Sequence, residues 1–188
     1  RRIAYHEGGH AIVGMLTPGA DPVRKVSIIP RGQALGVTLS TPEDDRFNYS
    51  EEELRAKIRV ALGGRVAEEI VYGEPTTGAE SDIQQVTMIA RGMVQRWGMS
   101  DEVGFVTVAR QDGQSLLLPG SEPASEATQE LVDAEVRRIV EEEHRAVTAL
   151  LTDNRHRLDA LAEALLERET LDEVDAYAVA EITREAVP

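Results

Sequence analysis

The stretch RRIAYHEGGHAIVGML, residues 1–16, organises the rest of the chain, because it holds two histidines four residues apart with a glutamate between them. At 3.6 residues per turn, His6 and His10 lie on nearly one helix face, about 6 Å apart along the axis, so both imidazoles can reach one tetrahedral ion. Glu7 falls beside that pair, where it can take a proton from a water that zinc has made more acidic. The pentad therefore predicts a catalytic zinc site.

Two other interpretations of the pentad compete with this one. Chance would produce such a pentad in a shuffled chain of this composition with a probability of about one in a hundred. A purely structural zinc usually has four protein ligands and favours cysteine, of which the chain has none. Gly8, Gly9 and Gly14 argue mildly against a helix here, since each costs about 1 kcal/mol of helix propensity relative to alanine. Small residues would, however, let another backbone approach the metal side.

Length and composition place the chain among single globular domains. Its 188 residues with 41% hydrophobic content support one core, with a catalytic region over 1–124 and C-terminal helices over 125–188. A net charge of -14 excludes generic nucleic-acid binding, which needs a basic face. No run of 18 apolar residues occurs, and the absence of cysteine fits a reducing compartment. Because the chain starts without methionine inside an expected helix, we expect it to be a piece of a longer protein.

The hydrophobic pattern predicts a mainly α-helical fold with a small β-hairpin or sheet. Strand-like stretches over 23–29 and 35–39 flank an expected turn at 31–34 and indicate an antiparallel pair. Such a sheet beside the catalytic helix could bind an extended peptide by strand addition, although a purely structural hairpin fits equally well. Residues 101–124 are expected to form a loop with one or two short strands.

Helices are expected over five further stretches. Capping boxes at Ser50 and Ser81 open helices that run to about Val71 and Trp97. Long apolar stripes follow over 126–151 and 155–166, and a last helix begins near Thr170. His144 lies within the apolar stripe of the 126–151 helix, so it is expected to pack between helices rather than bind metal.

A catalytic zinc needs three protein ligands and an open position, so one more residue must complete the site. The candidates are Glu68, Glu69, Glu80, Asp82 and His144. Asp82 ranks first, because it is expected in the first turn of a helix, where the helix dipole favours its ionised form. Glu80 ranks second, and a solvated helix face is the commoner explanation for the pair Glu68 and Glu69.

Beyond the pentad, several motifs in the same order resemble the peptidase domain of FtsH, the membrane-anchored AAA+ zinc protease. The likeness covers nearly all 188 residues and is carried by LGGRVAEE (62–69), TTGAESDI (76–83), RWGMS (96–100), VRRI (136–139) and NRHRL (154–158). The resemblance implies a helical zinc-peptidase fold and an ATP-dependent protease that degrades unfolded or membrane proteins.

The resemblance also implies roles for individual residues. His6, His10 and Asp82 would bind one Zn²⁺ per chain, and Glu7 would be the general base. The strand of Leu35, Gly36, Val37, Thr38 and Leu39 would be the edge on which the substrate is laid.

Other properties implied by the resemblance belong to the whole parent protein. It would be a bacterial homo-hexamer anchored in the membrane through segments outside this chain, with this domain on the cytoplasmic side and no nucleic-acid partner. ATP would bind only to an ATPase module outside this chain, which contains no Gly-Lys-Ser/Thr phosphate loop. Two functions remain in competition: a zinc endopeptidase acting on unfolded polypeptide, and a catalytically weak oligomerisation module of an AAA+ ring.

Overall fold

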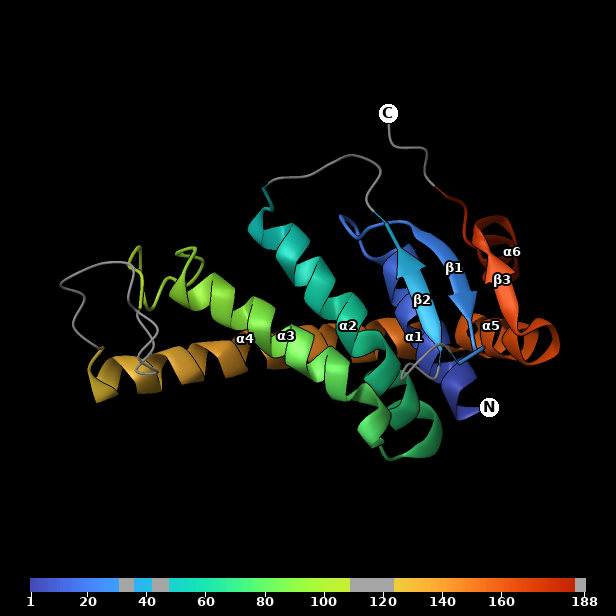
Figure 1. Cartoon of the computed structure of the whole chain (residues 1–188), viewed down its shortest axis with the longest axis horizontal. Coiled ribbons are helices and arrows are strands. Elements are labelled where there is room, and N and C mark those ends of the chain that lie inside the picture. Colours follow the sequence, from blue (N-terminus) through green and yellow to red (C-terminus); the bar gives the residue numbers. More distant parts are fainter. Residues whose placement is uncertain (31–35, 42–47, 109–123, 185–188) are drawn as a thin grey trace.

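The computed structural model describes residues 1–30, 36–41, 48–108 and 124–184. The elements, in chain order, are α1 (Arg2–Leu16), β1 (Val23–Ser27), β2 (Val37–Ser40), α2 (Glu51–Tyr72), a 3-10 turn (Thr77–Ala79), α3 (Glu80–Gln95), α4 (Glu126–Asp153), α5 (Arg155–Arg168), β3 (Thr170–Asp172) and α6 (Glu173–Val179). Helices make up most of the molecule, and the small sheet lies to one side of it next to α1 (Figure 1). The predicted fold class is thereby confirmed.

Helices α1 and α2 cross where two glycines face each other. A Cβ placed on Gly9 would lie 2.3 Å from the carbonyl oxygen of Gly63, and one on Gly63 would lie 2.7 Å from that of Gly9. Any larger side chain would force the two backbones apart, so glycine is needed at both positions. The residues that weaken the helices by propensity therefore allow their close approach.

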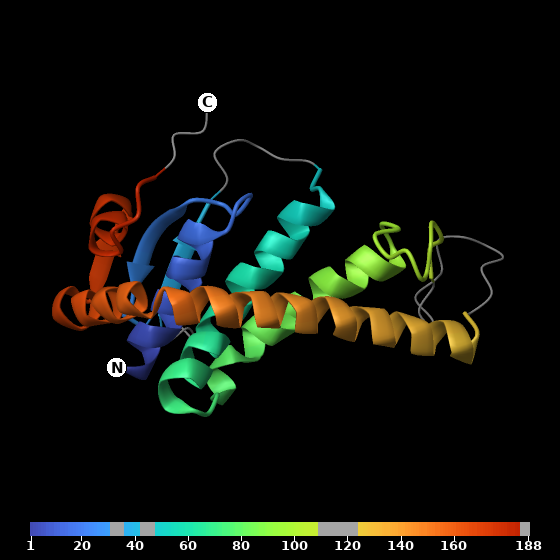
Figure 2. The same ribbon diagram turned by 180° about the vertical axis from the view of Figure 1, so that it is seen from behind.

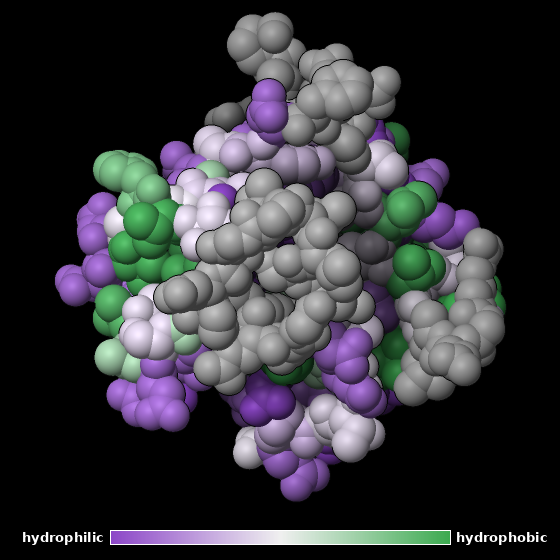
Figure 3. Space-filling view, turned by 60° about the vertical axis from the view of Figure 1, so that its left-hand side comes forward, coloured by the Kyte–Doolittle hydropathy of each residue, from purple (hydrophilic) through white to green (hydrophobic). Residues whose placement is uncertain are grey.

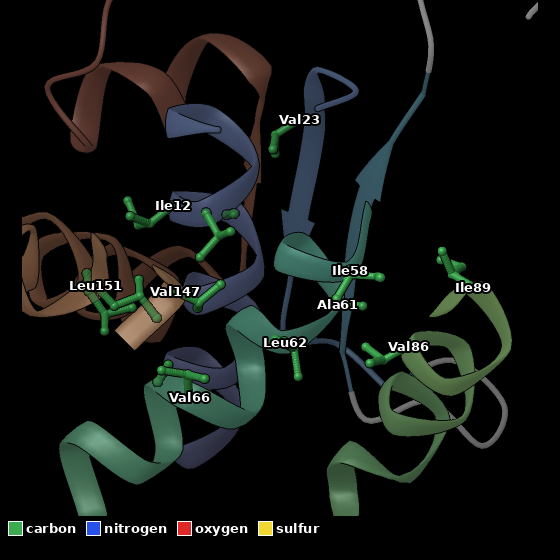
Figure 4. Close-up of a cluster of buried hydrophobic side chains, with 14 of the residues drawn as sticks. Ile12, Val23, Ile58, Ala61, Leu62, Val66, Val86, Ile89, Val147 and Leu151 are labelled. Atoms are coloured by element: carbon green, nitrogen blue, oxygen red, sulfur yellow. The ribbon is translucent and has the colours of Figure 1, made fainter. Parts of the chain in front are cut away.

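Around this crossing lies a continuous hydrophobic core. Ile12 of α1 and Ile58 and Leu62 of α2 are almost fully buried. Figure 4 shows side chains from four helices converging here, namely Ile12, Ile58, Ala61, Leu62, Val66, Val86, Ile89, Val147 and Leu151. Burial of one such aliphatic side chain stabilises the fold by about 1.5–3 kcal/mol, which outweighs the propensity cost of about 1 kcal/mol of a helical glycine.

The sheet has three antiparallel strands in the order β2-β1-β3. The predicted antiparallel pair is confirmed, with its second strand over Val37–Ser40 and Thr38 opposite Val26. The expected turn at 31–34 and Leu35 lie outside the described residues. Strand β3 was not predicted, because three residues are too few to show a period and Leu171 is held by pairing with Val26. Among the described strands, β2 forms one edge of the sheet.

One of the two predicted capping boxes is present. The Ser50 side chain accepts a hydrogen bond from the backbone of Glu53, whose carboxylate accepts one from the backbone of Ser50 at 2.7 Å. The box expected at Ser81 is wrong, because α3 starts at Glu80 without a side-chain cap. Thr76 instead caps the preceding 3-10 turn, which leads directly into α3 and places Ser81 inside the first turn. Asp82 still lies in that first turn, as expected.

The C-terminal helices cover the far side of the core. Figure 2 shows α4 running across the molecule, where it packs on α2 and α3, while α5 packs mainly on α1. Glu143 of α4 is 3% exposed and is paired with Arg55 and Arg59 of α2. This buried carboxylate is compensated by two guanidinium groups, which fixes α4 against α2.

Several large hydrophobic side chains are exposed. Phe105 is 97% exposed and Trp97 46% exposed, and Figure 3 shows hydrophobic surface gathered at the left and at the right of the view. Residues 101–108 contain no strand, and the rest of the stretch expected to contain one or two strands lies largely outside the described residues. Among the described helices, none combines the length and hydropathy needed to cross a membrane.

Candidate metal centre

His6 and His10 project from one face of α1 with their rings in contact. Their Nε2 atoms lie 3.1 Å apart, and the ring centroids lie 4.7 Å apart with the planes nearly perpendicular. The spacing of four residues thus directs both Nε2 atoms to one point, as the helix period requires. Both side chains are mostly buried, with about a tenth of each surface exposed.

Asp82 approaches the same point from the first turn of α3. Its Oδ2 lies 3.2 Å from His6 Nε2 and 3.5 Å from His10 Nε2. Within the described part of the chain, these three residues form the one group whose ligand atoms converge, all within 4.8 Å of one another. Two imidazoles and one carboxylate are a donor set suited to Zn²⁺.

The charges of the three groups are coupled. Burial opposes the charged forms of both His10 and Asp82, but the hydrogen bond and attraction between them outweigh it. The pKa of Asp82 therefore lies well below its usual range, and the pKa of His10 is raised. Asp82 is thus held as a carboxylate, the form that binds a metal ion.

The Nδ1 atoms of both histidines are fixed by α2. His10 Nδ1 lies 2.7 Å from the carbonyl oxygen of Val60, and His6 Nδ1 lies 2.9 Å from Glu68 Oε1. A carbonyl oxygen only accepts hydrogen bonds, so His10 must carry a proton on Nδ1, and in the neutral form of the ring Nε2 offers its lone pair. An acceptor at the outer ring nitrogen is the usual support of a histidine that binds a metal ion.

Gly64 of α2 makes room for the two ligand nitrogens. A Cβ at this position would lie 2.5 Å from His10 Nε2 and 2.6 Å from His6 Nε2. The sequence signal for this role was the Gly63-Gly64 pair in the middle of a predicted helix, which propensity alone does not explain. Sequence reasoning missed Gly64, as it missed the acceptor role of the Val60 carbonyl.

The other third-ligand candidates lie outside the converging group. Glu68 contacts His6 at Nδ1, not at the Nε2 atom that faces Asp82. Glu69 accepts from Arg65 and faces His144 Nε2 at 2.9 Å, and His144 is 36% exposed. His144 of α4 thus meets α2 through a polar contact and lies outside the converging group, in line with the expectation that it packs between helices and does not bind metal. Glu80 accepts from Gln84 on α3.

Glu7 lines a cleft of about 960 Å³ together with His6, His10 and Asp82. It is 7% exposed and buried between α1 and the segment that leads into β2. Thr38 Oγ1 lies 2.7 Å from Glu7 Oε2, and a Cβ at Gly36 would lie 2.6 Å from Glu7 Oε1. The sequence placed Thr38 and Gly36 on an expected substrate strand but did not indicate their contact with Glu7.

The cleft brings together residues far apart in the sequence. Its lining includes the histidines and Glu7 of α1, Gly36, Val37 and Thr38 of the β2 segment, and Asp82 of α3. A carboxylate able to act as a base therefore lies between three convergent metal-ligand atoms and an exposed strand edge. This is the arrangement that metal-assisted hydrolysis of an extended chain requires.

Comparison with known proteins supports the same interpretation. A model of peptidase family M41 matches residues 1–179. The chain is 66% identical over 180 residues to ATP-dependent zinc metalloprotease FtsH 3 of Conexibacter woesei, covering 96% of the chain and 24% of that protein. It is 57% identical over 176 residues to ATP-dependent zinc metalloprotease FtsH of Thermobaculum terrenum, covering 92% of the chain and 27% of that protein. The chain thus spans about a quarter of the length of these relatives, and it belongs to peptidase family M41.

Proposed function

We propose that this chain is a zinc-dependent endopeptidase domain in which His6, His10 and Asp82 bind one Zn²⁺ and Glu7 is the general base. The observation that carries the proposal is the convergence of the three ligand atoms within 4.8 Å beside the buried Glu7 carboxylate. The residues fit the ion, because both histidines present Nε2 to one point, Asp82 is held ionised, and Gly64 leaves the space free. The names of the relatives agree with this donor set.

The protein's own groups divide the work of hydrolysis. When bound, zinc polarises the peptide carbonyl and acidifies the attacking water. Glu7 accepts the proton of that water and delivers it to the leaving amine, which is general base and then general acid catalysis. Glu68 and the Val60 carbonyl hold the histidine rings in position through their Nδ1 atoms.

The edge strand indicates an extended substrate. Val37, Thr38 and Leu39 belong to β2, and Gly36 directly precedes it. Gly36, Val37 and Thr38 line the cleft that contains Glu7. An extended polypeptide that pairs with this edge would lie across the metal ligands. Leu35, the first residue of the expected substrate strand, lies outside the described residues. We therefore propose unfolded polypeptide as the substrate and Gly36–Leu39 as its binding edge.

We further infer that the chain is the peptidase part, as a single domain over 1–188, of a longer ATP-dependent protease. This rests on coverage of about a quarter of relatives named ATP-dependent zinc metalloproteases. The parent would degrade unfolded or membrane proteins as a membrane-anchored bacterial homo-hexamer, with this domain on the cytoplasmic side and ATP bound by another module. Exposed Leu131, Leu166 and Val174 on the C-terminal helices offer apolar contact surface for such a ring.

The test of the proposed function is Glu7→Gln with a permanently unfolded protein as substrate. The amide keeps the shape of the side chain and still accepts from Thr38, but it cannot take a proton. We expect bound zinc to remain at about one ion per chain while cleavage falls by about 10²–10⁴-fold. Metal analysis and a gel or fluorescence assay of the same preparation measure the two quantities.

Glu80→Gln is the matched control, since Glu80 lines the same cleft but is bonded within α3. It should keep both zinc and cleavage. Wild-type cleavage by Glu7→Gln would refute the base assignment. A zinc-loaded wild-type domain that cuts no unfolded protein would favour the oligomerisation module instead.

A further inference from the structure

Thr38 is the residue of β2 that contacts the proposed general base. Its Oγ1 lies 2.7 Å from Glu7 Oε2 and 3.0 Å from the backbone carbonyl oxygen of Glu7. Both oxygens accept hydrogen bonds, and the hydroxyl has only one proton to donate. The shorter contact goes to the charged oxygen, as expected for a charge-assisted bond, so the proton is donated mainly to the carboxylate.

Gly36 closes the other side of the same carboxylate. A Cβ there would lie 2.6 Å from Glu7 Oε1, 2.8 Å from Glu7 Cγ and 2.9 Å from the carbonyl oxygen of Ser27. The side chain of Glu7 is thus confined between the bare Cα of Gly36 and the hydroxyl of Thr38. Thr38 engages Oε2, and within the described residues it is the side-chain donor to that oxygen.

The alternating side chains of β2 divide the strand into a face that contacts Glu7 and an opposite face. Successive side chains of a strand point to opposite faces, so Thr38 faces α1 while Val37 and Leu39 face the other way. Leu39 is 46% exposed, in agreement with this alternation. The face of β2 toward α1 holds Glu7, and among the described strands the other edge of β2 has no partner. A peptide docked on that edge would therefore lie on the element that fixes the base.

We propose that Thr38 is the positioning residue of Glu7: the bond from its hydroxyl holds the carboxylate at the angle from which it takes the proton of the attacking water. This inference rests on the proposed function, because it assigns Thr38 a role in the step that Glu7 performs. A threonine that served only strand propensity or packing would be replaceable by valine, which has the same shape and a strong preference for strands.

The decisive comparison is Thr38→Val against Thr38→Ser, measured as kcat and KM on an internally quenched peptide. Valine removes the donor and places a methyl against Oε2, whereas serine keeps the hydroxyl. We expect Thr38→Val to lower kcat by about tenfold to a hundredfold with little change in KM, since misplacement of a reacting group by about 1 Å costs that much. Thr38→Ser should stay within about threefold of wild type.

Thr38→Ala removes the hydroxyl without adding a methyl against Oε2, so it controls for a steric effect of valine. It should lower kcat to a similar extent. Bound zinc and the thermal unfolding midpoint are measured for every variant, because the metal ligands and the core are untouched by these changes. A loss confined to KM would overturn the proposal and make Thr38 a substrate-binding residue. Equal losses in the serine and valine variants, or wild-type kcat in the valine and alanine variants, would also overturn it.

A crystal structure of Thr38→Val gives a readout that needs no activity. We expect the Glu7 carboxylate to leave its position beside residue 38 or to occupy several rotamers, while the ligand side chains superpose on those of the wild type. An unmoved, ordered Glu7 would overturn the proposal even if kcat fell. If the wild type binds zinc but cleaves nothing, the proposed function fails, and the position of Glu7 in this structure still decides the role of Thr38.

Discussion

Gly64 offers the sharpest test of the metal centre, because its replacement acts on the ligand nitrogens alone. In Gly64→Ala the three atoms nearest the new Cβ all belong to the rings of His6 and His10. An ordinary contact begins at 3.4 Å, so the Nε2 atom of His10 must move by about 0.9 Å and that of His6 by about 0.8 Å. Metal sites tolerate deviations of only about 0.2 Å in ligand distance. The rings also resist turning, since their Nδ1 atoms are held at 2.9 Å and 2.7 Å by α2.

We therefore expect Gly64→Ala to weaken zinc binding by at least about tenfold to a hundredfold, the range seen when the support of a metal ligand is lost. The assay is competition for zinc with a chromophoric chelator. The thermal midpoint of the zinc-free protein is measured in parallel. That midpoint reports the strain that the clash places on the two rings without the ion, which opposes the gain of about 1 kcal/mol in helix propensity of alanine over glycine.

Gly8→Ala is the matched control within α1. Its Cβ would meet Leu158 Cδ1 at 3.2 Å, the flexible end of a side chain, so zinc affinity should stay at the wild-type value. Zinc binding by Gly64→Ala within about twofold of wild type would refute the claim that the two nitrogens converge beneath this glycine. An equal loss in both variants would show that stiffening a helix, and not the clash, is responsible.

The remaining predictions concern the third ligand and assembly. Asp82, Glu68, Glu69 and Glu80 are replaced by alanine one at a time, and bound zinc is measured by metal analysis. We expect only the Asp82 variant to lose stoichiometric zinc, and the Glu68 variant to bind zinc more weakly, because Glu68 orients His6. A larger loss of zinc for Glu68 or Glu69 than for Asp82 would show that the proposed ligand set is wrong. Light scattering of the isolated domain at high micromolar concentration should detect oligomers, and a pure monomer there would count against assembly through this domain.

Local sequence rules predicted most of the helices. The capping box at Ser50 and the apolar stripe after it predicted α2. The stripe over 126–151 predicted α4, and the predicted end lies two residues before the observed end at Asp153. These elements are long and amphipathic, so their own period decides them. Strand β3 and the start of α3 escaped prediction, because pairing with β1 and the 3-10 turn after Thr76 decide them, and both depend on the rest of the fold.

In the candidate site, too, some residues could be predicted from local sequence spacing and others could not. A fixed helical spacing marked His6, Glu7 and His10, and the dipole at a helix start favoured Asp82. The supporting residues carry no spacing signal, because Glu68, Val60 and Thr38 reach the site only when α2 and β2 pack on α1. Sequence reasoning treated Glu68 as a rival ligand or a solvated residue, and it is instead 2% exposed beneath His6.

The crossing of α1 and α2 links the fold to the chemistry. Gly9 and Gly63 bring the two backbones into contact, and the next residues along each helix are His10 and Gly64. Because His10 Nδ1 meets the Val60 carbonyl on α2, a wider crossing would separate the ring from its acceptor and free it to rotate. The three glycines, Gly9 and Gly63 at the crossing and Gly64 beside the histidine rings, thus lower helix propensity by about 1 kcal/mol each. In return, the packing of the chain directs both imidazoles toward Asp82.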